Sequence, residues 1–559
     1  MRAADWAVLA ASLAFIVLYG MYKGRGSNTM NRYLLAGKTM PWYAMALSIM
    51  ATQASAITFI STTGQAYVDG MRFVQFYFGL PLAMVILSAT AVPIFHRAGV
   101  YTAYEYLEAR FDAKTRALAS AIFLIQRGLG VGLALYAPAL VLSVIFGWPD
   151  RITTVIMGVL VIAYTVFGGI QAVTWTDVQQ MLIIFFGLIV SAAMVIVLLP
   201  ADVSLLDAMR LAGAAGKLNA VDLRFDWNTP YTLWSGLIGG AFLMLSYFGC
   251  DQSQVQRYLT GRSIAQSRLS LLFNAAAKIP MQFFILFVGA MVFVFFLFER
   301  PPLLFQEVAL RGIQGTPAYA SLEGRYRKAF DSRRAAASDW VAARRDGDAA
   351  AEAASAARYR AAQKQLDGAR REGAELAGRA AGETGFNDTN YIFLHFVTRY
   401  LPPGIVGLII AAIFAAAMST ISAEINSLAT VTVIDIYRRH LRRGATDRHY
   451  LWASRAATAF WGVYAMTFAG YGKNLGSLIV AVNMVGSLFY GSLLGAFIAA
   501  FFLRRVRGGA AFYGMLAGEA AVFAAHTFTG ISFLWYNVIG CVVVIAVSLA
   551  VSGMMKRRK

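Results

Sequence analysis

Long apolar runs recur along the whole chain and are separated by short polar segments. A transmembrane helix needs about 20 predominantly apolar residues. On that basis we predict thirteen spans, at residues 4–22, 40–66, 73–96, 117–146, 152–168, 174–200, 232–251, 271–298, 403–436, 451–470, 474–502, 510–529 and 532–554. The composition agrees, since 58% of the 559 residues are hydrophobic and only 14% are charged, whereas about a quarter are charged in soluble domains. The pattern predicts an all-α polytopic membrane protein.

One apolar run, residues 411–437, carries polar side chains in its middle: Ser419, Thr420, Ser422, Glu424 and Asn426. Polar groups at this depth of a bilayer are costly and usually mark an ion or substrate path. Hydroxyl groups beside small alanines offer hard oxygen ligands with room for a bare cation, so the run predicts a sodium site. Packing or hydrogen bonding between helices is the alternative explanation for such hydroxyls.

Basic residues gather in every second connecting segment. If the N-terminus lies outside, the inward segments carry most of the Lys and Arg clusters, at residues 23–38, 97–116, 257–268, 438–448, 504–507 and 556–559. Positive charge favours the cytoplasmic side, so we predict an inner (plasma) membrane protein with a cytoplasmic C-terminus. This distribution accounts for much of the net charge of +20 without a nucleic-acid partner. The first apolar segment shows no cleavage site and is predicted to be an anchor helix.

Residues 300–388 form the one long segment that does not suit a bilayer. They are rich in Ala, Arg and Glu and contain few large apolar residues. We predict two polar helices outside the membrane, separated near Asp346-Gly347-Asp348. The segment is interpreted as a solvated insertion, with a cap that binds a partner or ligand as the alternative. No obligate protein partner is evident.

The spans fall into two groups of five, within residues 40–200 and 231–502. An odd number of crossings per group gives the second group the opposite sense, as in the inverted repeats of secondary transporters. The first span of each group is polar, with Thr52, Gln53, Ser55 and Thr58 in one and Asp251 in the other. We predict broken helices there, which point to a binding site. Residues 1–39 would precede the repeats, and residues 503–559 would follow them.

Four stretches carry a family resemblance: SIMATQASAITFIS at 48–61, GGIQAVTWTDVQQ at 168–180, the region FGCDQSQVQR to LLFNAAAKIP at 248–280, and AAAMSTISAEINSLATVTVIDIY at 415–437. With these motifs the chain resembles the sodium:solute symporters. The resemblance implies a five-plus-five inverted-repeat fold, sodium as the coupling ion, and alternating access to a site at the broken helices.

The resemblance also implies which residues hold sodium. The shared site would use the carbonyls of Ala51, Ala54 and Ala416 and the hydroxyls of Ser419 and Thr420. Residues 416 and 419/420 lie one helical turn apart, as one face requires. A second site found in some members would use Asp177, Ser419 and Ser422, although Ala423 replaces a further hydroxyl. The alternative role for Asp177 is to complement a helix dipole.

The solute site is less clearly marked. Gln53 and Thr58 lie at the first break, and Tyr77 and Met244 occupy positions that are polar in sugar transporters. Tyr247 and Lys278 match residues found in the family. The pattern around Arg127 is similar to that of the monocarboxylate and multivitamin branch. A membrane-embedded arginine needs a counter-charge. The counter-charge of Arg127 would be a solute carboxylate, held bidentately, or a structural acid such as Glu424. The remaining alternative is that the Arg127 side chain snorkels to the membrane surface.

Together these features predict a sodium-coupled symporter that imports a small polar solute, with an organic anion favoured and a sugar or polyol as the alternative. A transporter-like sensor is disfavoured because no signalling motif follows the last span. An enzyme is disfavoured because we find no nucleophile elbow, phosphate loop or His/Cys cluster; Cys250, Cys541 and His526 stand alone. Since one sodium and one monoanion carry no net charge, a second sodium would let the membrane potential drive uptake of a carboxylate.

Overall fold

The computed structural model describes the chain except residues 147, 149, 383–385, 471–476 and 558–559. These omissions take in the start of the span predicted at 474 and the end of the basic tail. The described residues are helical or irregular, without a strand; Met40 and Gly261 form one isolated bridge. Nine described helices are long and apolar enough to cross a membrane, or ten if one bent pair counts as a span.

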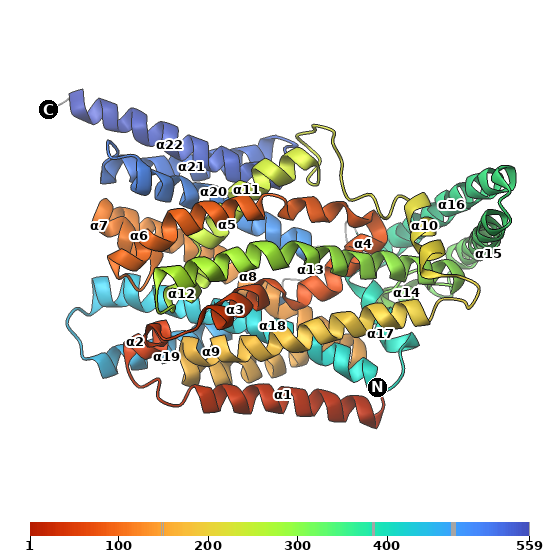
Figure 1. Cartoon of the computed structure of the whole chain (residues 1–559), viewed down its shortest axis with the longest axis horizontal. Coiled ribbons are helices and arrows are strands. Elements are labelled where there is room, and N and C mark those ends of the chain that lie inside the picture. Colours follow the sequence, from red (N-terminus) through yellow and green to blue (C-terminus); the bar gives the residue numbers. More distant parts are fainter. Residues whose placement is uncertain (147, 149, 383–385, 471–476, 558–559) are drawn as a thin grey trace.

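The spanning helices run roughly parallel to the long axis of the molecule (Figure 1). They are α1 (Ala3–Lys23), the η3–α5–α6 segment (Met71–Ala98), α8 (Ala113–Phe146), α9 (Asp150–Val197), α13 (Ile264–Phe298), α18 (Ile405–Val431) continued by η6 (Thr432–Leu441), α20 (Leu478–Phe502), α21 (Gly508–Phe528) and α22 (Phe533–Arg557). The bent pair joins α3 (Trp42–Gln53) to η2 (Thr58–Thr62) and α4 (Thr63–Asp69) at an angle of 61°.

With the bent pair counted as one span the described residues form ten, and three further places account for the difference from the thirteen predicted. The helix α9 covers two predicted spans, and its backbone turns at Gly169, where φ is 56° and ψ is −159°. A Cβ atom there would lie 2.5 Å from the carbonyl oxygen of Tyr33, so glycine suits this turn. The apolar helix at Ser235–Gly249, made of η4 and α11 (Gly240–Gly249), is short. The third, α19 (Asp447–Ala469), carries charged residues in its first turns.

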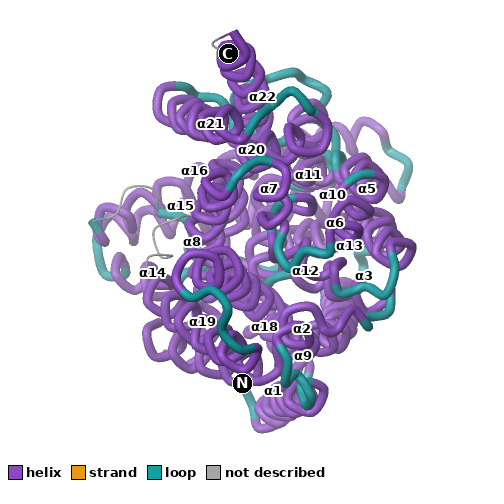
Figure 2. The backbone as a smooth tube through the Cα atoms, turned by 90° about the vertical axis from the view of Figure 1, so that its left-hand side faces the viewer, coloured by secondary structure: helices purple, strands orange, loops and turns teal. Residues whose placement is uncertain are grey.

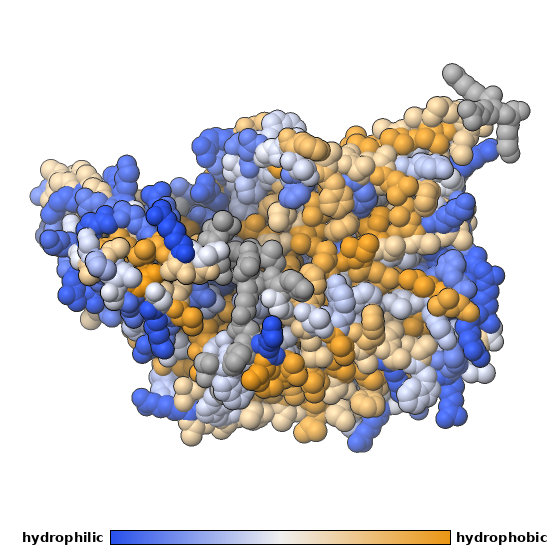
Figure 3. Space-filling model, turned by 180° about the vertical axis from the view of Figure 1, so that it is seen from behind, coloured by the Kyte–Doolittle hydropathy of each residue, from blue (hydrophilic) through white to orange (hydrophobic). Residues whose placement is uncertain are grey.

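The two chain ends lie at opposite ends of the bundle (Figure 1). With the N-terminus lie α4, α10 (Leu205–Ala214), α14 (Glu307–Ile313), η5 (Thr389–Tyr391) and α17 (Ile392–Tyr400). With the C-terminus lie α2 (Met30–Leu35), η1 (Ala36–Lys38), α7 (Ala103–Arg110) and α12 (Gln252–Leu259). Between the ends, apolar side chains form a broad band across the surface, with polar side chains concentrated at both ends (Figure 3).

The segment 300–388 contains two long helices, α15 (Pro317–Arg345) and α16 (Ala349–Ala381), which turn at Asp346–Asp348 as the sequence predicts. They pack against each other and project from the N-terminal end of the bundle (Figure 1). Tyr326 and Phe330 of α15 meet Leu366 of α16 in a small apolar core of their own. Arg333 is buried and donates to the carbonyl oxygen of Phe296 at the end of α13, which anchors the hairpin.

The helix α18 lies inside the bundle, between α9, α19 and α12 in the end-on view (Figure 2), and it also contacts α8, α1 and α3. Nearly all of its residues are buried. A helix that is apolar around its whole circumference is expected to be surrounded by other helices. Its few polar residues are therefore buried as well, and they need partners from neighbouring helices.

Candidate functional site

The first predicted break is present at the end of α3. The helix stops at Gln53, and Ala54 has φ −86° and ψ 61°, outside the helical region. The next helical element, η2, begins at Thr58, whose hydroxyl donates to the carbonyl oxygen of Gln53 at 3.2 Å. This bend frees main-chain carbonyl groups in the middle of a membrane span, where they need a donor or a cation.

The helix α18 meets this break through Thr420. The Thr420 hydroxyl lies 2.9 Å from the carbonyl oxygen of Thr52 and 3.2 Å from that of Ala416. Ala51, Ala54 and Ala416 are fully buried. Five residues that sequence reasoning assigned to a sodium site thus come from two elements in contact. Neutral oxygens in this arrangement suit a hard monovalent cation.

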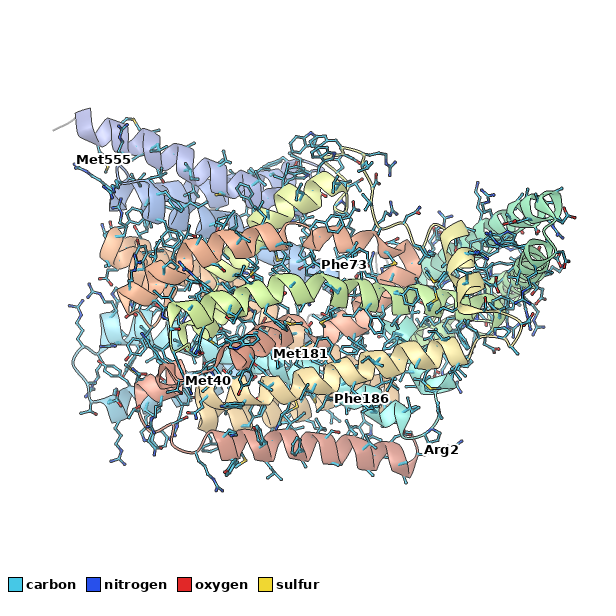
Figure 4. The ribbon with its side chains drawn as sticks, viewed as in Figure 1. Arg2, Met40, Phe73, Met181, Phe186 and Met555 are labelled. Atoms are coloured by element: carbon cyan, nitrogen blue, oxygen red, sulfur yellow. The ribbon has the colours of Figure 1, made fainter. Side chains whose placement is uncertain are left out.

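The second predicted break is also present. The helix α11 ends at Gly249, and Asp251 caps α12 by accepting a hydrogen bond from the backbone N–H of Ser253 at 2.9 Å. Both breaks lie near the cavity described below. Arg2 and Met555 lie at opposite ends of the molecule, with Phe73 between them (Figure 4).

Asp177 lies where α9, α3, α12 and α18 meet. Its carboxylate accepts hydrogen bonds from the hydroxyls of Ser48 at 2.5 Å and Ser419 at 2.6 Å. It also pairs with the guanidinium of Arg257, 3.0 Å away, and both side chains are buried. The Ser422 hydroxyl donates instead to the carbonyl oxygen of Ser419 at 3.0 Å. A positive charge therefore already balances this carboxylate.

A cavity of about 110 Å³ opens beside the first break. Its wall contains five of the six predicted solute-site residues, together with Met244 and Thr420: Gln53, Thr58, Tyr77, Arg127 and Tyr247. A single water needs roughly 10–15 Å³ of such volume, so the cavity has room for several waters or one small solute. The sixth predicted residue, Lys278, is buried with its Nζ 5.5 Å from the centroid of the Tyr77 ring, and Nζ has no hydrogen-bond partner among the described residues.

Arg127 lies on the cavity wall and is held by two acids, of which Glu424 also lines the cavity. Its Nη1 donates to Glu424 Oε1 at 2.7 Å, and its Nη2 donates to Asp251 Oδ2 and, at 2.6 Å, to the Tyr490 hydroxyl. Tyr490 in turn donates to Asp251 at 2.9 Å, and the guanidinium lies over the Tyr247 ring at 5.5 Å. The cluster thus joins α8, the second break, α18 and α20.

Sequence reasoning missed several members of this site. Asp251 was recognised as a polar residue at a break, but not as a partner of Arg127. Arg257 was counted only among loop charges, and its pairing with Asp177 was not expected. Gln126, Asn483 and Tyr490 also line the cavity. Gln126 and Asn483 are polar residues in otherwise apolar spans, so the sequence could have indicated them as site residues. Nothing in the sequence distinguishes Tyr490 in this way.

Comparison with known proteins places this geometry in context. The chain is 28% identical to a sodium/sialic acid symporter of Proteus mirabilis over 97% of this chain and 93% of that protein. It is 27% identical to the human sodium-coupled monocarboxylate transporter 1 over 92% of this chain and 72% of that protein. The solved substrate-bound, outward-open structure of a Na⁺-coupled sialic acid symporter matches with a TM-score of 0.76 and 25% identity, covering 99% of this chain and 98% of that one.

The family profile called "Sodium:solute symporter family" matches residues 33–301 and 372–518. The gap between the two stretches holds α14, α15 and the first part of α16. The match covers most of the chain on both sides of the hairpin, including both breaks and the polar stretch of α18. The chain therefore belongs to the sodium:solute symporter family. Members of this family are transporters and not enzymes, and they use sodium.

Proposed function

We propose that this symporter imports a small organic anion, with monocarboxylates favoured, by alternating access. The observation that carries the proposal is the contact of Thr420 with the Thr52 carbonyl, at the wall of a cavity that also contains Arg127. An ion at the break would touch the same two elements that border the solute. The relatives named for monocarboxylates and for sialic acid, itself a carboxylate, support an anionic solute.

We assign the coupling sodium to the carbonyl groups of Ala51, Ala54 and Ala416 and to the hydroxyls of Ser419 and Thr420. Sodium bound there would replace the hydrogen bonds that Thr420 now makes to main-chain oxygens. Because the cage is neutral, it binds the ion without the strong hold of a carboxylate. Release to the inside then needs only that α3 and α18 separate.

Asp177, Ser419 and Ser422 form the candidate second cation site. Ser419 is common to both sets, and it donates to Asp177. The guanidinium of Arg257 lies 3.0 Å from the same carboxylate, so a second sodium would have to share it with an existing positive charge. We therefore assign coupling to the first site and expect uptake to depend on sodium without cooperativity.

For the solute we propose a site formed by Gln53, Thr58, Tyr77, Arg127 and Tyr247, with Lys278 behind Tyr77. Arg127 and Lys278 are the two basic side chains near the cavity, and they are the groups to which an anion would bind. The alternative, a sugar or polyol, is favoured by one observation: both Nη atoms of Arg127 are already engaged by protein acids. The amides of Gln53, Gln126 and Asn483 on the cavity wall would suit hydroxyl groups.

We further propose thirteen crossings in a five-plus-five inverted repeat, with repeats at 40–200 and 231–502 and the insertion 300–388 outside. An odd number of crossings agrees with chain ends at opposite ends of the bundle (Figure 1). The basic segments around α2, α7 and α12 lie with the C-terminus (Figure 1), which favours a cytoplasmic C-terminus in the inner membrane. Residues 1–39 and 503–559 would then flank the transport core.

The function is tested with purified protein in proteoliposomes. An inward sodium gradient should drive uptake of at least one labelled monocarboxylate from a panel that also contains sialic acid, glucose and a polyol. Potassium or choline in place of sodium should abolish that uptake. Sodium-driven uptake of glucose or the polyol alone would support the alternative, and uptake that is equal in choline would contradict the sodium site.

A further inference from the structure

The short helix α12, which follows the second break, is polar but fully buried. It carries amide, hydroxyl or guanidinium groups at Gln252, Ser253, Gln254, Gln256 and Arg257, and all eight of its residues are buried. The Ser253 hydroxyl and Gln254 Oε1 have no hydrogen-bond partner among the described residues. Burial without a partner costs free energy. Such a helix suits a segment that meets water in another conformation of the transporter.

The helix α7 holds the second break through three hydrogen bonds. The Tyr104 hydroxyl donates to the carbonyl oxygen of Cys250 at 2.9 Å. Gln252 uses both ends of its amide: Oε1 accepts from the Ala103 N–H at 3.0 Å, and Nε2 donates to the carbonyl oxygen of Tyr101 at 2.9 Å. The non-helical residues between α11 and α12 are thereby tied to the start of α7.

The same helix is bound on its other side to α8 and η6. The Thr102 hydroxyl donates to Asp435 Oδ1 at 2.9 Å. Arg116 of α8 donates to Asp435 at 2.6 Å and to Glu108 of α7 at 2.7 Å. Arg439 of η6 donates to the other oxygen of Glu108 at 2.7 Å. Each of these bonds has at least one charged partner.

The helix α7 therefore bridges the second break and the pair formed by α8 and η6. If the break moves relative to that pair, one of the two sets of bonds must open. Hydrogen bonds to charged groups are roughly twice as strong as those between neutral groups. The three bonds at Tyr104 and Gln252 join neutral groups, so separation occurs there and α7 stays with α8 and η6.

Three consecutive residues connect this contact to the solute cavity. Asp251, between Cys250 and Gln252, pairs with Arg127 on the cavity wall and accepts from Tyr490 at 2.9 Å. The break is thus held from the cavity by Arg127 and from the other side by α7. A solute that pairs with Arg127 competes with Asp251 and leaves the neutral bonds to α7 as the main restraint.

We propose that α7 is a latch that closes the solute cavity towards the end of the bundle that holds the C-terminus, where α7 and α12 lie (Figure 1). Tyr104 and Gln252 are its positioning residues. While their bonds hold, Asp251 stays paired with Arg127 and α12 stays buried. When the bonds release, α12 moves away from α7 and its polar side chains meet water. This latch acts within the alternating access proposed above and depends on no particular solute.

Amide hydrogen exchange of the full chain in detergent tests the latch, because it detects local opening. The Ala103 N–H donates across the contact, so its exchange reports release directly, and residues 249–255 report movement of the break. Tyr104→Phe removes the hydroxyl that holds Cys250 and keeps the ring. Loss of one hydrogen bond makes opening about fivefold more frequent, so both reporters should exchange about fivefold faster. Peptides of α1 and α16 should exchange as in the parent.

The matched control is Tyr106→Phe, which also removes one hydroxyl from α7. The Tyr106 ring packs against Phe95 and Phe501, and this variant should exchange as the parent does. A second variant, Gln252→Leu, removes both amide bonds to α7 and should speed exchange in residues 249–255. It carries the test if Tyr104→Phe does not fold.

Sodium should act on the same reporters in the parent protein. Sodium at the first break would hold α3 against α18, and α12 contacts both helices. Exchange of residues 249–255 should therefore be slower in sodium chloride than in choline chloride, while peptides of α16 exchange equally in the two salts.

Unchanged exchange in Tyr104→Phe and Gln252→Leu overturns the latch. So does an equal rise throughout the chain, because that is a general loss of stability. If uptake into proteoliposomes depends on sodium, equal exchange of residues 249–255 in sodium and choline also overturns it, and the proposed function stands. If uptake does not depend on sodium, the proposed function falls, and the comparison of Tyr104→Phe with Tyr106→Phe decides the latch alone.

Discussion

The Thr420 hydroxyl donates a 2.9 Å hydrogen bond to the main-chain carbonyl of Thr52, at the point where α3 breaks off. The contact joins residues 368 positions apart in the chain. It places a hydroxyl of the buried helix α18 against a carbonyl group that helix geometry has left free. An ion bound at this point would be released when the two helices separate.

Replacing Thr420 with alanine removes one of five proposed sodium ligands. We expect the sodium concentration for half-maximal uptake to rise about tenfold, which corresponds to about 1.4 kcal/mol. Sodium-dependent uptake in proteoliposomes provides the measurement. Ser427→Ala is the control, because the Ser427 hydroxyl lies on the same helix but donates only within it, to the carbonyl of Glu424. Equal sodium dependence in the two variants would remove Thr420 from the site.

Replacing Asp177 with asparagine leaves Arg257 buried without its counter-charge. Breaking a buried ion pair in this way costs about 3–5 kcal/mol, so the variant should unfold at a markedly lower temperature. Adding Arg257→Met to Asp177→Asn should restore part of the loss, because no unpaired charge remains.

The control for Asp177 is Asp339→Asn, which breaks an exposed pair with Arg358 at 3.0 Å. Exposed pairs contribute about 0–1 kcal/mol, and little change is expected. If Asp177→Asn were as stable as the parent and altered only the sodium dependence, Asp177 would act as an ion ligand rather than as the partner of Arg257.

Local features of the fold were predictable from sequence because they depend on neighbouring residues. The polar helices α15 and α16 and the turn at Asp346-Gly347-Asp348 follow from composition alone. The break after Gln53 follows from a cluster of small and polar residues within one apolar run. The turn at Gly169 follows from a glycine pair between two apolar runs, although α9 continues as helix on both sides.

Most pairings between distant residues were not predictable in the same way; the exception is Arg127 with Glu424, which the sequence offered as one alternative and which the structure contains. Hydrophobic periodicity gives the buried face of a helix but not its neighbour. Arg127 and Asp251 are 124 residues apart, and Asp177 and Arg257 are 80 apart. Each charge was visible in the sequence and each clearly needed a partner. Only the packing of α8, α9, α12 and α18 determines which acid faces which base.

Lys278 provides a test of the anion site. Its ammonium is buried without a hydrogen-bond partner among the described residues, an arrangement that costs stability. We expect Lys278→Met to increase the free energy of unfolding by about 1–3 kcal/mol and so to raise the thermal midpoint. The same variant should bind carboxylates about tenfold more weakly, because one of two positive charges near the cavity is lost.

The control for Lys278 is Gln282→Met, one turn later on α13. Its amide is also buried without a hydrogen-bond partner among the described residues, but it is uncharged. This variant should gain stability without losing affinity. If Lys278→Met binds carboxylates as tightly as the parent protein, Lys278 has no part in solute recognition.

His395 makes stability depend on pH at the end of the bundle that holds the N-terminus. It lies on α17, outside the spanning segments, with its ring centroid 5.5 Å from that of Phe305 and 6.2 Å from that of Tyr400. Burial, together with the nearby charge of Arg399, lowers the pKa of His395 from 6.5 to about 4. The folded protein therefore holds the neutral ring, while the unfolded chain takes up a proton below about pH 6.5.

Stability should consequently fall as the pH drops from about 6.5 towards 4, since only the unfolded state gains the proton in that window. Between pH 7.5 and pH 5 the loss is about 2 kcal/mol by linkage. Thermal midpoints of the parent, of His395→Asn and of the control His440→Asn should be compared at both values. His440 is an exposed residue near the end of η6. His395→Asn should lose less stability than the parent on acidification, and His440→Asn should lose as much; an equal loss in all three would assign the pH dependence to other groups.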